Sequence, residues 1–99
     1  SKNPTIEKKQ ALVKTINQNF NVKKIVANNN FIYVTNADND GIKIYKSTLS
    51  SFSLQNKILT DNQYVEDLLV HNNRLYAIYS GKLFIYDIRD ATPKLLNTQ

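Results

Sequence analysis

The sequence contains no cysteine, so it can form neither a disulfide nor a thiolate metal site. Its single histidine, His71, has no nucleophile motif and no second soft ligand around it, which excludes a catalytic triad and a zinc site. No apolar run approaches the ~20 residues that a membrane span needs. No signal peptide is visible, although a mature or excised chain would have lost one. The length of 99 residues allows one domain with one core.

The charge of the chain is unevenly distributed. Residues 1–24 carry six Lys and one Glu, which is the whole net charge of +5, whereas residues 25–99 carry seven basic and seven acidic residues. A duplex-binding protein usually clusters Arg and Lys on one folded surface, but here Lys outnumbers Arg eleven to two. We interpret the basic end as a solvated segment and predict no nucleic-acid binding and no membrane insertion.

The chain repeats itself. Residues 14–35 (KTINQNFNVKKIVANNNFIYVT) align without a gap with residues 57–78 (KILTDNQYVEDLLVHNNRLYAI). After a two-residue deletion, IKIYK (42–46) aligns with LFIYD (83–87). Matched pairs include Asn29 and Asn72, Tyr33 and Tyr76, and Tyr45 and Tyr86. A period of about 41 to 43 residues is typical of one four-stranded propeller blade.

Short apolar segments separated by turn residues predict four strands in each copy. The expected strands are 22–27, 31–36, 42–46 and 52–59 in the first copy, and 65–70, 74–79, 82–87 and 94–97 in the second. Runs such as FIYV and LFIY show no polar alternation, which predicts sheets covered on both faces. An isolated pair of sheets would expose two apolar faces, so we expect either further blades in a longer chain or self-association.

The repeat unit has the pattern V-x-x-I/L-x-V, two or three Asn, an apolar strand with Tyr, a D/N-rich turn ending in Gly, and apolar-x-I-Y-D-I. This pattern resembles the LVIVD repeat of bacterial and archaeal β-propellers. SGKLFIYDIRDATPKLLNTQ (80–99) looks like the family's strand and turn, and SKNPTIEKKQALVKT (1–15) looks like the end of a preceding unit. Tyr45 and Tyr86 depart from the usual Val, and Lys24 differs from its counterpart Asp67. The resemblance implies a propeller fold, an interaction role and no shared catalytic residues.

We therefore predict an all-β chain of antiparallel four-stranded β-propeller blades, as a fragment of a longer propeller. Residues 1–21 would be the outer strand of a preceding blade, 22–63 the first blade and 64–99 the second. Residues 4–16 also fit an amphipathic helix, because Pro4 suits the first helical position and apolar residues recur on one face. The alignment of this region with a strand and turn of the second copy favours the strand.

The turn NADNDG (36–41) begins as a calcium loop does. Asn36, Asp38 and Asp40 are oxygen ligands at alternate positions, followed by a glycine at the sharp turn. The twelfth position, where such a loop needs a bidentate acid, is Ser47, and the matching turn of the second copy has no acids. We interpret this segment as a hairpin turn without a metal, with those three residues as the candidate ligands of a weak calcium site.

Two tyrosines are candidate ligand contacts. Tyr64 and Tyr79 match Asn21 and Asn36 rather than tyrosines in the first copy, so repeat packing does not by itself explain them. Each has the alternative of ordinary burial or of a place in a ligand groove.

The sequence contains no constellation of catalytic residues, and we predict no enzyme activity and no cofactor. The predicted function is a non-catalytic propeller scaffold that recognises a protein or a glycan, extracellular, at the bacterial cell surface or in the periplasm. Two alternatives stand beside it. One is a fragment of a propeller enzyme whose catalytic residues lie outside this chain, and the other is a small self-assembling lectin-like module.

Overall fold

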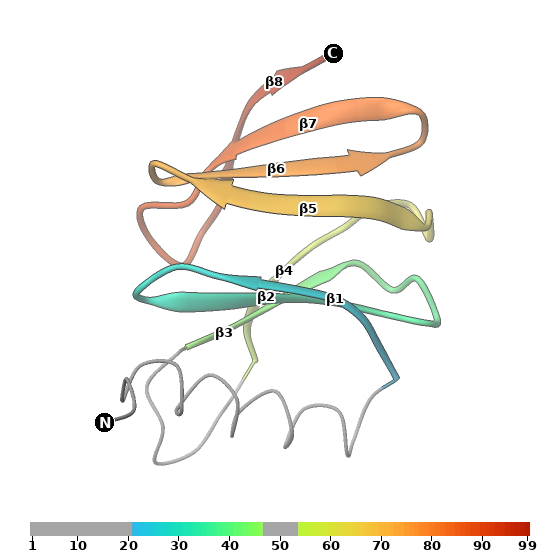
Figure 1. Cartoon of the computed structure of the whole chain (residues 1–99), viewed down its shortest axis with the longest axis horizontal. Coiled ribbons are helices and arrows are strands. Elements are labelled where there is room, and N and C mark those ends of the chain that lie inside the picture. Colours follow the sequence, from blue (N-terminus) through green and yellow to red (C-terminus); the bar gives the residue numbers. More distant parts are fainter. Residues whose placement is uncertain (1–20, 47–53) are drawn as a thin grey trace, which may run out of the picture.

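The computed structural model describes residues 21–46 and 54–99, which form eight β-strands. The strands are β1 (Val22–Ala27), β2 (Phe31–Asn36), β3 (Ile42–Lys46), β4 (Leu54–Ile58), β5 (Val65–His71), β6 (Arg74–Tyr79), β7 (Lys82–Asp87) and β8 (Lys94–Thr98). They form two antiparallel sheets with the orders β1-β2-β3-β4 and β5-β6-β7-β8. Figure 1 shows these sheets as two stacked layers. The described residues contain no helix, and hence none that could span a membrane.

The prediction of an all-β chain with four strands per repeat is confirmed for the described residues. The bounds differ only at strand ends: β5 extends one residue further to His71, β8 extends to Thr98, and β4 ends at Ile58, one residue before the predicted end. The predicted strand positions 52 and 53 lie outside the described residues. The two sheets are not closed into a ring, so the propeller remains a prediction. The strand or helix predicted within residues 1–21 lies outside the described residues, apart from Asn21.

The internal repeat is reproduced in the pairing of the strands. In both sheets, the pairing of the first strand with the second contains one irregularity, and so does the pairing of the third strand with the fourth. These irregularities lie at aligned positions in the two copies. The irregular positions are Val22/Lys24, Val65/Asp67, Ile44/Tyr45 and Ile85/Tyr86. A bulge adds an unpaired residue and bends its strand. Aligned residues in the two copies therefore hold equivalent places in the two sheets.

Residues that tolerate positive φ make the tight turns. The β5–β6 hairpin turns through Asn72 and Asn73, at φ 48° and 61°, and the β6–β7 hairpin through Ser80 and Gly81, at φ 54° and 69°. Two consecutive residues with positive φ give the turn that best matches the twist of a hairpin. The β2–β3 turn of the first sheet is longer and ends at Gly41, whose φ of 110° is favourable only for glycine.

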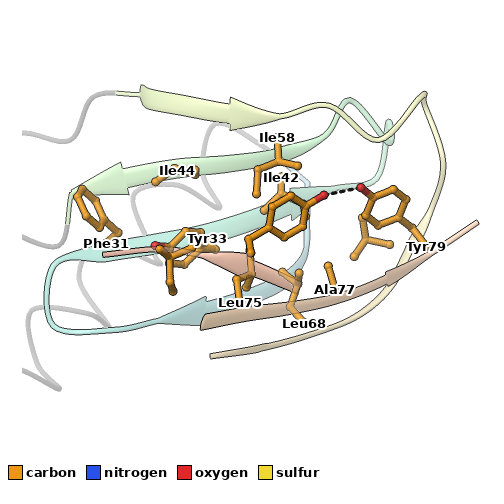
Figure 2. Packing of buried hydrophobic residues seen from close by; sticks show 12 residues of the cluster. Phe31, Tyr33, Ile42, Ile44, Ile58, Leu68, Leu75, Ala77 and Tyr79 are labelled. Atoms are coloured by element: carbon orange, nitrogen blue, oxygen red, sulfur yellow. Dashed lines mark hydrogen bonds between the residues drawn. The ribbon is translucent and has the colours of Figure 1, made fainter. Parts of the chain in front are cut away.

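The core lies between the sheets, and the two faces of each sheet differ in what they contact. Aligned residues of the two copies are given the same face name, A or B. The core residues on face A of the first sheet are Val26, Phe31, Tyr33, Ile42, Ile44 and Ile58. The core residues on face B of the second sheet are Val65, Leu68, Val70, Leu75, Ala77, Tyr79, Phe84 and Tyr86. These two faces pack against each other as the main core (Figure 2). Face B of the first sheet holds a second cluster, which contains Val22, Ile25, Ala27, Ile32, Val34 and Tyr45.

The predicted covering of both faces is found in the first sheet and not in the second. All six residues of β2 are buried, so both faces of the first sheet are covered there. In the second sheet, face A carries the side chains aligned with face A of the first sheet, and Leu69 on this face is 59% exposed. The matched tyrosines differ accordingly, because Tyr33 is fully buried and Tyr76 only partly.

Candidate ligand groove between the sheets

A groove opens between the two sheets, beside the β1–β2 turn and the β7–β8 connection. Its volume of about 540 Å³ lies within the range of small-molecule binding sites. The groove is lined by Asn30, Phe31, Lys46, Gln55, Arg89, Asp90 and Ala91. Both sheets therefore contribute to it.

The side chain of Asn28 fixes the β1–β2 turn on one side of the groove. Its Oδ1 accepts hydrogen bonds from the backbone N–H of Asn30 at 2.9 Å and of Phe31 at 2.7 Å. The backbone N–H of Asn28 donates to the carbonyl of Phe31 at 3.0 Å. A side chain that bonds its own turn in this way holds the backbone without a partner from elsewhere. These bonds fix this edge of the groove, where Phe31 is 8% exposed and its side chain packs in the core.

The β7–β8 connection is tied to the first sheet on the other side of the groove. Asn56 of β4 donates from Nδ2 to the carbonyl oxygen of Ala91 at 3.1 Å. Within the connection, Asp90 Oδ1 accepts the backbone N–H of Thr92 at 3.0 Å. These two bonds fix the backbone that carries Arg89 and Asp90 into the groove.

Arg89 lies between the groove and a smaller recess. Its Nη2 donates to Asp87 Oδ2 at 2.6 Å, and its Nε lies 3.1 Å from both carboxylate oxygens. These hydrogen bonds lower the pKa of Asp87 below its ordinary value, and the ion pair orients the guanidinium. The recess has a volume of about 270 Å³ and is lined by Asn72, Asn73, Arg74, Asp87, Arg89 and Leu96.

The groove residues suit the recognition of a hydroxyl-rich ligand. They supply two amides, a guanidinium, an ammonium and a carboxylate, which together can donate and accept hydrogen bonds. The sequence alone does not predict these residues as a site. They belong to two repeats and to connections between strands, and they come together only when the two sheets pack.

The structure places the two candidate tyrosines apart from the groove, since neither is among the residues that line it. Tyr79 is 6% exposed and lies in the core, where its ring stacks on Phe84 with centroids 3.8 Å apart. Its hydroxyl lies 2.6 Å from the hydroxyl of Tyr86 (Figure 2, dashed line). Burial raises the pKa of both hydroxyls, so the neutral hydrogen-bonded pair persists at neutral pH. Tyr64 is 50% exposed in the β4–β5 connection, where a ligand can reach it.

The turn that resembles a calcium loop is paired with an ammonium group from the next strand. Lys43 Nζ lies 2.9 Å from Asp40 Oδ2, and the lysine is 8% exposed. Burial acts to raise the pKa of Asp40, but the hydrogen bond and charge of Lys43 outweigh it and lower the pKa. Within the described residues, Asn36 Oδ1 and Asp40 Oδ1 are buried without a hydrogen-bond partner. The same residues contain no cluster of three or more His, Cys, Asp or Glu that could hold a metal.

We expect calcium to leave the stability of this protein unchanged. Lys43 compensates Asp40 where a divalent cation would sit, so calcium would have to bind beside a positive charge. A site occupied at 100 times its dissociation constant would add ~2.7 kcal/mol, which thermal unfolding resolves easily. The measurement is the melting temperature in millimolar calcium, in the same concentration of magnesium, and after chelation. A rise that is specific to calcium and lost on chelation would show that the turn is a calcium site.

Comparison with family models, with curated proteins and with solved structures finds no match to this chain.

Proposed function

We propose that the chain is part of a non-catalytic β-propeller scaffold that recognises a glycan or a protein at the bacterial cell surface or in the periplasm. The observation that carries the proposal is the pair of equivalent four-stranded sheets, which share their pairing irregularities and pack face to face. Face-to-face packing of repeated four-stranded antiparallel sheets is the building principle of a propeller. The resemblance of the repeat to the LVIVD pattern supports the same reading.

Recognition is assigned to the groove between the sheets, with a glycan as the favoured ligand. The groove volume of about 540 Å³ suits a compact ligand better than a broad protein surface. Its polar side chains can bond sugar hydroxyls. The Asp87–Arg89 ion pair and the Asn56–Ala91 hydrogen bond hold this surface in place before a ligand arrives, which reduces the entropy lost on binding.

The proposal is tested by binding the purified chain to a panel of immobilised bacterial and animal glycans, followed by titration of the strongest binder in solution. Arg89→Ala should weaken this binding at least about tenfold, equivalent to ~1.4 kcal/mol. Arg74→Ala is the matched control, because Arg74 lines the neighbouring recess and not the groove. Binding to no glycan on the panel, or equal effects of the two arginine variants, would remove the groove from the proposal.

A further inference from the structure

Face A of the second sheet is the exposed counterpart of a surface that is buried in the first sheet. Its members are Leu69, Tyr76, Ile78, Leu83 and Ile85. They align with Val26, Tyr33, Thr35, Ile42 and Ile44, of which all but Val26 are buried. In the first sheet this face is covered by face B of the second sheet. In the second sheet, Leu69 is 59% and Ile78 36% exposed.

An asparagine on each sheet extends this equivalence to a single hydrogen bond. Asn56 and Asn97 occupy aligned positions, opposite Ile44 and Ile85 respectively. Each accepts the backbone N–H of the next residue on its Oδ1, at 2.8 Å in both cases. Asn56 Nδ2 then donates across the sheet interface to the carbonyl of Ala91. Asn97 has the same local bond, but its Nδ2 has no partner among the described residues.

We propose that face A of the second sheet is a docking surface for a third sheet of the same repeat, which presents the face B pattern and accepts a hydrogen bond from Asn97. The pattern consists of aliphatic residues at the positions of Leu68, Leu75 and Ala77, and the carbonyl lies at the position of Ala91. This inference rests on the proposed scaffold function and names the partner that the scaffold requires. It gives the assembly a direction, because face A always meets face B.

A second copy of this chain is less suited to the role than a further sheet. The face B that a second copy would need to present is that of its first sheet, where Ile32, Val34 and Tyr45 are 1%, 0% and 3% exposed. Near the β2–β3 turn, that face carries Asn36 and Lys43, which is paired with Asp40. The aligned positions of the second sheet are Tyr79 and Phe84. A third sheet with the second repeat's face B would instead reproduce the aromatic corner that already packs on the first sheet.

The experiment retains the full chain and repeats residues 59–99 after Gln99. Because Gln99 aligns with Ile58, the junction reproduces the β4–β5 connection. The chain has no cysteine, so Ile78→Cys in the second sheet is a unique accessibility probe. The cysteine at position 78 should react with a thiol reagent at least about tenfold more slowly in the extended protein than in the 99-residue chain. Lys82→Cys, at an exposed position of β7, should react equally in both proteins.

Two further variants separate docking from mere folding of the added segment. Ile78→Lys in the second sheet should leave the melting temperature of the 99-residue chain unchanged and abolish the higher melting temperature expected of the extended protein. Asn97→Asp preserves the acceptor of the local bond and removes the donor, so it should lower only the melting temperature of the extended protein. The melting temperature of each variant is measured in the 99-residue chain and in the extended protein, so the 99-residue chain serves as the control.

Each outcome decides the question. An added segment that stays unfolded, or that folds without slowing the reaction of the cysteine at position 78, would overturn the proposal. If the 99-residue chain forms a dimer that Ile78→Lys dissociates, the occupant is a second copy and the proposal is wrong. A negative result for docking would leave glycan binding by Arg89 unaffected. A negative result for glycan binding would leave the accessibility of Ile78 unaffected, so the two experiments test the two proposals independently.

Discussion

Replacing Tyr33 by alanine is expected to lower the free energy of unfolding by about 3–5 kcal/mol, the usual cost of removing a large buried aromatic side chain. Tyr33 is 0% exposed and packs in the core between the sheets. Tyr76→Ala is the matched comparison, because Tyr76 holds the equivalent place in the second sheet but is only partly buried. We expect the loss at Tyr76 to be well under half of that at Tyr33.

Urea denaturation of dilute samples measures both losses, and Tyr33→Phe separates the ring from the hydroxyl. The hydroxyl of Tyr33 is buried without a hydrogen-bond partner of good geometry, and burial raises its pKa to about 12, against a smaller opposing effect of Asn28. Removing this hydroxyl should therefore leave stability unchanged or raise it by ~1 kcal/mol. An unchanged stability in Tyr33→Ala would contradict the register, and equal losses at both positions would mean that face A of the second sheet is covered in solution.

Gly41→Ala is the second substitution with a large expected effect, a loss on the order of 3 kcal/mol. The φ of Gly41 is 110°, where a side chain is strained whatever the space around it. A Cβ there would also lie 2.6 Å from the backbone carbonyl oxygen of Ile58, which cannot move without disturbing β4. Strain and steric overlap therefore act together at this position.

Gly81→Ala provides the control in the corresponding turn of the second repeat. Gly81 has a φ of 69°, and an added Cβ would meet no atom within 4 Å. Only the left-handed backbone then opposes the substitution, at about 1–2 kcal/mol. Thermal and denaturant unfolding of the two variants measures the difference. Similar losses in both would indicate that the overlap at Ile58 is relieved by a small shift of the β2–β3 turn.

The strands were predictable because the signals that define them are local. Runs of β-branched and aromatic residues between Asn-, Asp- and Gly-containing turns predict all eight strands in the described residues to within one or two residues of their ends. The repeat alignment even anticipated the equivalence of Tyr33 with Tyr76, since both lie opposite aligned isoleucines of the third strand.

Which face meets which could not be read from the sequence, because the strands are apolar on both faces. For this reason, the mismatch of Tyr79 with the aligned Asn36 made Tyr79 a candidate ligand contact. The structure places it in the core because face B of the second sheet packs on the first sheet, whereas Asn36 lies at the opposite side of the stack. The groove escaped prediction for the same reason, since Phe31 and Arg89 are 58 positions apart in the sequence and meet only after the sheets have packed.

The order of the strands has a consequence for how the protein folds. Within each sheet of the described residues, the strands pair in sequence order, so each hydrogen-bonded ladder closes through a short connection at a small cost in chain entropy. In the part of the chain that the structure describes, the contacts between distant segments come mainly from the packing of one sheet on the other. Such a contact pattern favours rapid folding for a β protein, with each sheet able to form before the two associate. Backbone amides in the middle of a sheet and side chains between the sheets should then acquire protection at different times during refolding.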